Sequence, residues 1–297
     1  MRWVVGTDHG LRGSEGEAWL VDRSVTDVVP DGRGWLALVD RREVVRLNGD
    51  EVESLGAVED EVGRCLLRAD GGVLVGTGHA RLAFVRDGDV ELLPSFDDAE
   101  GRDRWYTPWG GPPDTRSLTA SPDGRLFANV HVGGILRATD PTGTWSPTID
   151  IDSDVHQVLA DPLDPAHVVA ATALGLAESA DGGNSWTFET NGLHARYSRA
   201  VALDGDMLFQ SASTGPRGGR AAVYRREKVG DAFVKCEGGL PEWFDGNVDS
   251  HCLAASGGSV LFGTEDGRAF LSEDRGDSWG EVLSGAANVH CVAIAPG

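Results

Sequence analysis

The chain has 297 residues, with 47 acidic and 26 basic side chains and a net charge of −21. So acidic a surface argues against DNA, RNA and anionic membranes as main partners, because their phosphates would be repelled. No apolar run approaches the length of a membrane span, and no signal-type segment follows Met1. Four cysteines (Cys65, Cys236, Cys252 and Cys291) have neither metal-type spacing nor a secreted disulfide pattern, so we expect a reduced, cytoplasmic protein.

Short apolar strands recur about every forty residues, which is typical of a propeller or a solenoid. The repeating units span residues 24–61, 62–115, 116–154, 155–197, 198–249 and 250–288. The unit at 155–197 is the clearest, with strands expected at His156–Ala160, Val168–Thr172 and Leu176–Ser179 and a short fourth strand before Asn191. We predict a single domain over residues 1–297.

The two ends of the chain read as parts of one further unit. Residues 2–7 resemble a second strand that lacks a first strand, and residues 289–297 resemble a first strand with no unit behind it. Pairing them would complete a blade and remove two free sheet edges. The expected fold is therefore all-β, a seven-bladed β-propeller in which the N- and C-terminal strands close one blade. Six blades is the alternative if residues 24–61 or the terminal blade are irregular.

A short motif marks the hairpin after the third strand of two units. It comprises Ser179, Asp181, Gly183, Ser185 and Trp186 in one unit, and Ser272, Asp274, Gly276, Ser278 and Trp279 in the other. We expect the Asp and Ser side chains to accept hydrogen bonds from backbone N–H groups, the Gly to adopt positive φ and the Trp to enter the core. A partial copy lies at residues 139–145.

This motif resembles the Asp-box, or BNR, repeat of sialidase-type propellers. The resemblance is at the level of repeats and covers nearly the whole chain. The overall pattern is similar to bacterial Asp-box propellers, including those of sialidases, sortilin and photosystem assembly factors. It implies a fold and says little about function, because the box braces a turn and performs no chemistry.

One residue occupies the start of each inner strand, where side chains are expected to face the central channel. In chain order these ring residues are Thr26, Arg64, Arg116, His156, Arg199, His251 and His290. Arginine is rarely buried without a partner, so the ring should face water, acids or an anionic ligand.

The three ring histidines suggest a metal site. His156, His251 and His290 could hold one divalent transition metal (Zn, Cu or Fe) and leave a position open for water or substrate. The alternative is a polar, water-filled channel in which these histidines form hydrogen bonds with water and with Asp154 or Asp249. The positive charge of the neighbouring arginines opposes a bound cation.

The three ring arginines, Arg64, Arg116 and Arg199, are candidates for binding the carboxylate or phosphate of a small anionic ligand. The alternative is that they pair with Asp8, Asp40 or Glu265 across the channel. Residues 94–115 form an insertion that carries Trp105, Tyr106 and Trp109, which we expect to be a wall or lid for substrate.

Candidate acid and base residues lie where second strands should return to the channel mouth: Asp8, His131 and Glu265. Together these features predict a metal-dependent hydrolase or lyase acting on a small anionic substrate. The alternative is a non-catalytic propeller that binds a protein, a peptide or a glycan, and a monomer is compatible with either.

A sialidase-like glycoside hydrolase is the minor alternative. Sialidases also use three arginines, but the family's Arg-Ile-Pro motif is absent here and its propeller has six blades. The ring of histidines and arginines is also similar to that of peptidylglycine amidating lyase, another six-bladed propeller. No motif outside the ring supports that family.

Overall fold

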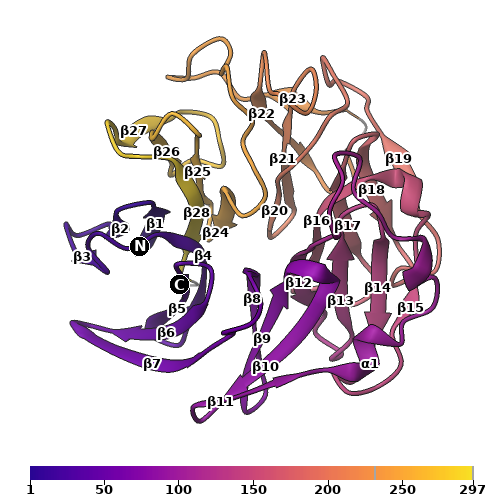
Figure 1. Cartoon of the computed structure of the whole chain (residues 1–297). Coiled ribbons are helices and arrows are strands. Elements are labelled where there is room, and N and C mark those ends of the chain that lie inside the picture. Colours follow the sequence, from indigo (N-terminus) through magenta and orange to yellow (C-terminus); the bar gives the residue numbers. More distant parts are fainter. Residues whose placement is uncertain (231, 296–297) are drawn as a thin grey trace.

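The computed structural model describes residues 1–230 and 232–295 and folds them into seven antiparallel sheets of four strands each. The sheets are arranged as blades around a central axis (Figure 1). We number the blades from the one that holds the N-terminus. The predicted all-β, seven-bladed propeller is confirmed.

Blade 1 is built from both ends of the chain, with β28 (Val289–Ile294), β1 (Trp3–Thr7), β2 (Gly10–Gly13) and β3 (Ala18–Trp19). Blade 2 contains β4 (Val25–Asp31), β5 (Gly34–Val39), β6 (Glu43–Asn48) and β7 (Glu51–Ala57). Blade 3 contains β8 (Gly63–Ala69), β9 (Gly72–Thr77), β10 (Arg81–Arg86) and β11 (Asp89–Leu92). Blade 4 contains β12 (Thr115–Ala120), β13 (Leu126–Val130), β14 (Gly134–Ala138) and β15 (Ser146–Pro147).

Blade 5 contains β16 (Val155–Ala160), β17 (Val168–Thr172), β18 (Gly175–Ser179) and β19 (Thr187–Glu189). Blade 6 contains β20 (Val201–Asp204), β21 (Met207–Ala212), β22 (Ala222–Glu227) and β23 (Val234–Lys235). Blade 7 contains β24 (Leu253–Ser256), β25 (Ser259–Gly263), β26 (Ala269–Ser272) and β27 (Gly280–Leu283). The helical turns are short: η1 (Gly78–Ala80), α1 (Pro94–Asp97), η2 (Arg102–Arg104) and η3 (Ile151–Ser153). None of the helices in the described residues is long and apolar enough to cross a membrane.

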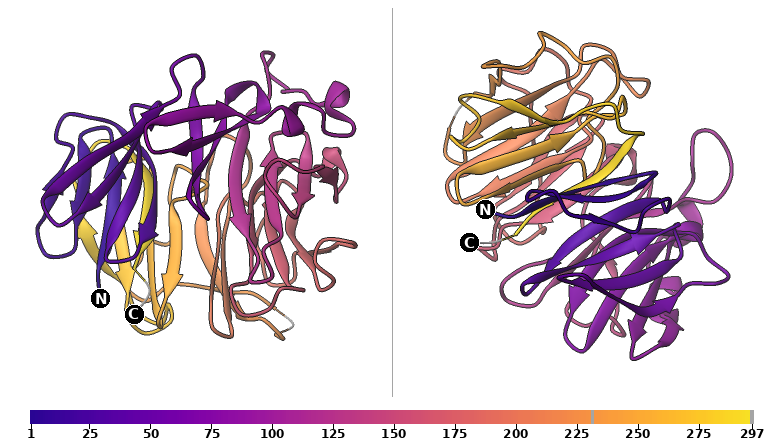
Figure 2. Two further views of the ribbon diagram at one scale, coloured as in Figure 1. Left: turned by 90° about the horizontal axis from the view of Figure 1, so that it is seen from below. Right: turned by 90° about the vertical axis from the view of Figure 1, so that its left-hand side faces the viewer.

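The ring closes through β28, which pairs antiparallel with β1 so that Val292 lies opposite Val5. Both termini lie together at one end of the strands (Figures 1 and 2), and the segment around α1 lies at the other end in the left-hand view of Figure 2. Because the last strand joins the first blade, β28 becomes the innermost strand of that blade and covers the edge of β1.

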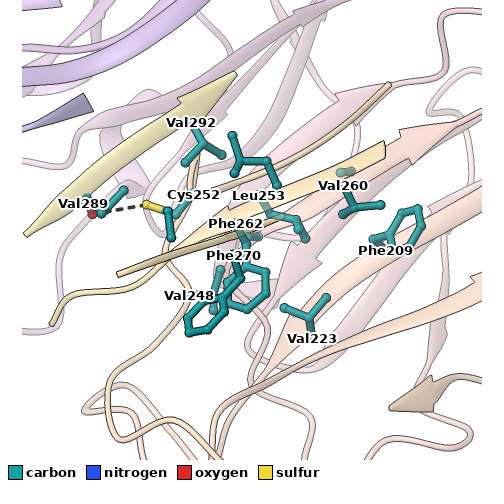
Figure 3. Close-up of a cluster of buried hydrophobic side chains, with 14 of the residues drawn as sticks. Phe209, Val223, Val248, Cys252, Leu253, Val260, Phe262, Phe270, Val289 and Val292 are labelled. Carbon is teal, nitrogen blue, oxygen red and sulfur yellow. Dashed lines mark hydrogen bonds between the residues drawn. The ribbon is translucent and has the colours of Figure 1, made fainter. Parts of the chain in front are cut away.

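Apolar side chains fill the spaces between neighbouring blades. Figure 3 shows one such cluster, in which Phe209 of blade 6 and Phe262 and Phe270 of blade 7 pack with Val292 of blade 1. The Sγ of Cys252 lies 3.4 Å from the carbonyl oxygen of Val289 in the same view. The burial of aromatic and aliphatic surface between blades is the main contribution to the free energy that holds neighbouring blades together.

Three cysteines occupy equivalent places in this packing. Each follows a ring residue, is buried, and approaches a backbone carbonyl of the next blade; they are Cys65, Cys252 and Cys291. As free thiols between blades they serve as small apolar residues.

The two boxed hairpins have the expected hydrogen bonds. Ser179 Oγ accepts from the Gly183 N–H at 2.8 Å, and Asp181 accepts from the Ser185 N–H at 2.9 Å. In blade 7, Ser272 Oγ accepts from Gly276 at 2.8 Å and Asp274 accepts from Ser278 at 2.8 Å. Gly183 and Gly276 have φ of 84° and 85°, values that glycine adopts without strain. Trp279 is buried, whereas Trp186 is only partly buried.

Candidate functional site

The ring residues occupy one structural position, and in five blades that position is a β-bulge. The register of the inner strand against its neighbour shifts by one residue around Thr26, Arg64, Arg116, His156 and His290. A bulge adds a residue that has no partner opposite it and turns its side chain away from the regular alternation. The repeated bulge therefore presents the ring side chains at the channel.

A cavity of about 240 Å³ lies at this end of the channel. Residues from several blades line it, among them Arg64, Asp114, Arg116, Arg199, Asp249 and His290. The structure therefore brings the three predicted arginines together in one cavity, although they are far apart in the sequence.

Two of these arginines are paired with aspartates. Arg64 Nη2 lies 3.2 Å from Asp114 Oδ2. Arg199 forms an ion pair with Asp249, and its Nη2 also donates to the carbonyl of Pro216 at 3.0 Å. Burial lowers the pKa of Arg199 and the charge of Asp249 raises it, with a net upward direction. The alternative pairing with Asp8, Asp40 or Glu265 is therefore wrong for Arg64 and Arg199.

Arg116 differs from both. Its guanidinium lines the cavity and makes no ion pair or hydrogen bond with any side chain or carbonyl in the described parts of the chain. Burial lowers the pKa of Arg116, and the charge of Arg199 acts in the same direction. The negative charges of Asp114 and Asp154 offset this in part from a distance. Arg116 is thus a partly desolvated cation whose donors remain available.

The three ring histidines do not form the predicted metal site. His156 donates from Nδ1 to the Ser198 carbonyl at 2.6 Å, His251 donates from Nε2 to the Arg116 carbonyl at 2.8 Å, and His290 Nε2 lies 2.6 Å from Asp8. Each imidazole is thereby committed to a different oxygen. Within residues 1–230 and 232–295, no group of three or more His, Cys, Asp or Glu side chains is placed to hold a metal ion. The residues present do not fit the metal expected from the sequence.

The second ring nitrogen of His156 is also engaged. Because Nδ1 donates to a carbonyl, Nε2 accepts, and the Tyr197 hydroxyl lies 3.1 Å from it. Burial lowers the pKa of His156 to about 3, so this imidazole is neutral. His156 is 1% exposed and belongs to the wall of the channel rather than to its open space.

His131 lies next to this wall under the insertion. It is 2% exposed, and burial followed by the charges of Arg116 and Arg199 lowers its pKa to about 3. Its Nε2 lies 3.6 Å from Asp154 Oδ1, which is itself 3.7 Å from His156 Nε2. Burial raises the pKa of Asp154. A neutral, buried imidazole of this kind is a poor match for the acid–base role predicted for His131.

The other two acid–base candidates have different environments. Asp8 accepts hydrogen bonds from His290 and Ser24, and the bond from His290 is the main reason that its pKa is lowered. Glu265 is exposed, but burial of part of its carboxyl and the charge of Asp249 raise its pKa. Of the three predicted residues, only Glu265 has the raised pKa that suits a general acid.

The aromatic residues of the insertion separate into two kinds. Trp105 packs against Phe96 with ring centroids 5.9 Å apart and belongs to a buried cluster, so it is not the substrate wall that was predicted. Its side chain instead holds the insertion on blades 3 and 4. Tyr106 is 47% exposed and Trp109 is 68% exposed, and the Trp109 ring lies 6.1 Å from that of His131.

Asp114 and Asp249, which pair with the ring arginines, were not predicted as arginine partners. A signal for them exists in the sequence, because Asp114, Asp154 and Asp249 each stand two residues before a ring residue. Each of these aspartates lies just before an inner strand, in the loop that enters the channel mouth. The repeat of Asp-x-Arg or Asp-x-His could have identified all three.

A larger hollow of about 570 Å³ lies between blades 2 and 3, away from the ring residues. Arg46 and Arg68 line it, and both donate to Asp31 at 2.9 and 2.8 Å. A third arginine of this hollow, Arg86, is exposed on its rim and lies 5.5 Å from the Phe84 ring centroid. The smaller cavity is the better candidate site, because its Arg116 is partly desolvated and lies among ring residues of several blades.

No family model matches the sequence, and no sequence among the curated proteins matches it either. Solved structures match the fold. The GH74 xyloglucanase from Xanthomonas campestris has a TM-score of 0.66 and 15% identity, over 95% of this chain and 46% of that chain. YCF48 bound to D1 peptide has a TM-score of 0.57 and 13% identity, over 91% and 84%. The Neurospora crassa Pan2 WD40 domain has a TM-score of 0.58 and 9% identity, over 84% and 75%.

These similarities support the propeller fold. The chain spans less than half the length of the GH74 enzymes that it matches, and all of the identities are low. Proteins with such a fold serve many unrelated functions, so the function has to be argued from the cavity itself.

Proposed function

We propose that this propeller binds a small anionic ligand, one that presents a carboxylate, in the cavity at the channel mouth. The observation that carries the proposal is the guanidinium of Arg116, which lines the cavity and has no ion pair or hydrogen bond with residues 1–230 or 232–295. Arg64 and Arg199 beside it are already paired with Asp114 and Asp249. Of the three ring arginines, Arg116 is therefore the one with no ion pair in the described parts of the chain, and Asp114 and Asp154 offset its charge only in part from a distance.

A carboxylate suits this site for geometric and electrostatic reasons. The planar guanidinium presents parallel N–H donors that match the two oxygens of a carboxylate. The partial burial of Arg116 lowers the screening by water and strengthens such a bond. The net charge of −21 opposes large polyanions, and the 240 Å³ volume favours a small ligand or the terminal group of a larger one.

Acetate is a suitable first probe because it carries the carboxylate and little else. We expect isothermal titration at constant ionic strength to detect acetate binding to the full chain. The Arg116→Gln variant should bind acetate about 10- to 100-fold more weakly, the effect of one charge-assisted hydrogen bond. Arg86→Gln is the matched control, since Arg86 is an exposed arginine of blade 3 that lies outside this cavity and forms no ion pair with the residues that the structure describes. Equal acetate affinity in Arg116→Gln and the unaltered protein would overturn the proposal.

A hydrolase acting on the bound anion is the second candidate, and Glu265 is the residue that favours it. Burial and the charge of Asp249 raise the pKa of Glu265, a direction that suits a general acid, and Asp249 itself lines the cavity. The histidine geometry gives no support to a metal-dependent route. Turnover of 4-nitrophenyl glucuronide that disappears in Glu265→Gln but survives in Glu281→Gln, on the outer strand β27, would favour catalysis. Binding without turnover would favour a non-catalytic propeller.

A further inference from the structure

We infer that the carboxylate ligand carries a flat aromatic ring, and that Trp109 is the residue that binds this ring. The inference rests on the proposed function and adds the chemical class of the ligand. Trp109 is 68% exposed, the largest exposed fraction among the aromatic side chains of the described residues, and its ring lies 6.1 Å from that of His131. An indole left in water is a surface for apolar contact.

Trp109 is held in place by the fold of the insertion. Trp105 anchors the base of the segment on Phe96, and the Arg102 guanidinium lies 5.1 Å from the Trp105 ring centroid. The Tyr106 N–H donates to the Val132 carbonyl at 3.4 Å. Thr107 Oγ1 then donates to the carbonyls of Gly110 and Gly111 at 2.8 and 2.9 Å, which closes the turn that presents Trp109.

His131 is the common neighbour of Trp109 and Arg116. The two rings lie 6.1 Å apart with 30° between their planes, and the Arg116 charge contributes to lowering the pKa of His131 to about 3. The indole of Trp109 therefore lies over a neutral, buried imidazole, with Asp154 3.6 Å from His131 Nε2 on the side of the channel. Next to the charged cavity, Trp109 supplies an exposed apolar ring.

The neighbouring polar groups favour an aromatic ring over a sugar ring. Both nitrogens of His156 have partners, and the Tyr197 hydroxyl is shared between His156 and Arg199. His131 Nδ1 is buried. A sugar would need donors and acceptors for several hydroxyl groups and would leave them poorly matched at this wall. An aromatic ring needs only the face or edge of Trp109.

The test compares benzoate with acetate on the full chain by isothermal titration at one pH and ionic strength. We expect benzoate to bind more tightly than acetate, and Trp109→Ala to reduce this preference about three- to tenfold, the range for an aromatic pair. Trp109→Phe should retain most of the preference. Phe188→Ala is the matched control, because Phe188 is an exposed aromatic residue on the outer strand β19.

The outcomes separate this inference from the proposed function. Arg116→Gln should weaken acetate and benzoate by the same factor, so that the preference between them is unchanged. If both anions bind through Arg116 but Trp109→Ala retains the preference for benzoate, the aromatic inference is wrong and the proposed function stands. Preference for glucuronate or cyclohexanecarboxylate over benzoate would also overturn the inference. If neither anion depends on Arg116, the proposed function itself fails.

Discussion

The boxed hairpins and the channel mouth both depend on aspartates, but they use them over very different distances in the sequence. Asp181 accepts from residues three and four positions further on, so the hydrogen bonds of its carboxylate are complete within one turn of one blade. At the channel, His251 donates to the carbonyl of Arg116, 135 residues away, and Asp27 of blade 2 accepts from the Leu66 N–H of blade 3 at 2.6 Å. The hairpin is a local structure, whereas the channel exists only once all the blades have assembled.

This difference explains why only one of the two regions is available for a ligand. In the hairpins every oxygen of Asp181 has a donor from the same turn. In the channel, the ring positions bring three arginines together with two aspartate partners, and among the described residues Arg116 has no such partner. The repeat therefore forms two similar hydrogen-bonded hairpins away from the channel, and at the channel it leaves the N–H donors of Arg116 available to a ligand.

Removal of the closing strand should have the largest effect on stability, because the channel forms only when all seven blades are joined in a ring. Deletion of residues 289–297 removes β28, exposes the edge of β1 and opens the apolar seam against blade 7. We expect aggregation or loss of cooperative unfolding, measured by light scattering and by calorimetry. A truncated protein that stays monomeric with an unchanged melting temperature would contradict the importance of closure.

The second-largest effect on stability is expected from the loss of the hydrogen bonds that Asp27 accepts between blades 2 and 3. Asp27 is 1% exposed and accepts from the N–H groups of Val28 and Leu66. Asp27→Ala leaves both donors buried without an acceptor, and we expect a loss of about 1–3 kcal/mol in unfolding free energy, measured with urea. Asp27→Asn retains one oxygen and should lose less. Equal losses in the two variants would show that packing, not hydrogen bonding, joins these blades.

The boxes should affect stability but not anion binding. We expect Asp181→Ala and Asp274→Ala to lower the urea midpoint and leave acetate affinity unchanged, with Glu273→Ala as a control beside the second box. Hydrogen bonds, chiefly from Ser185 and Ser278, lower the pKa of Asp181 and Asp274 to about 2. Since the unfolded value is 3.8, this stabilisation is complete above that pH and is lost as the pH falls through about 2. Variants that lose stability equally at pH 2 and pH 7 would contradict the assignment.

The smallest effect is expected for the paired arginine nearest the site. The side chains of Arg64 and Asp114 are 31% and 20% exposed, so solvent screens their ion pair. Arg64→Gln should change the unfolding free energy by less than about 1 kcal/mol. It should also weaken acetate less than Arg116→Gln does, because Arg64 is already neutralised by Asp114. An equal effect of the two substitutions on acetate affinity would show that the arginines act as one group.

The amino-acid sequence determined the propeller, its seven blades and the residues at the start of each inner strand. These follow from local patterns: strand alternation, turn residues and a repeat of about forty residues, each of which acts within a few neighbouring positions. The sequence also determined the geometry of the two boxes, since the carboxylates of Asp181 and Asp274 take their donors from within four residues. Whether these hairpins mark membership of the Asp-box family stays a prediction.

Only the tertiary structure decided how the ring residues are used. His156, His251 and His290 share a repeat position, but bulges and neighbouring blades direct their nitrogens to Ser198, Arg116 and Asp8. Likewise, Trp105 and Trp109 are four residues apart, yet one is packed against Phe96 and the other is exposed. Partner choice among equivalent side chains depends on angstrom-scale distances across the channel. The repeat pattern determines which residues lie at the channel, but it does not determine which atoms form hydrogen bonds there.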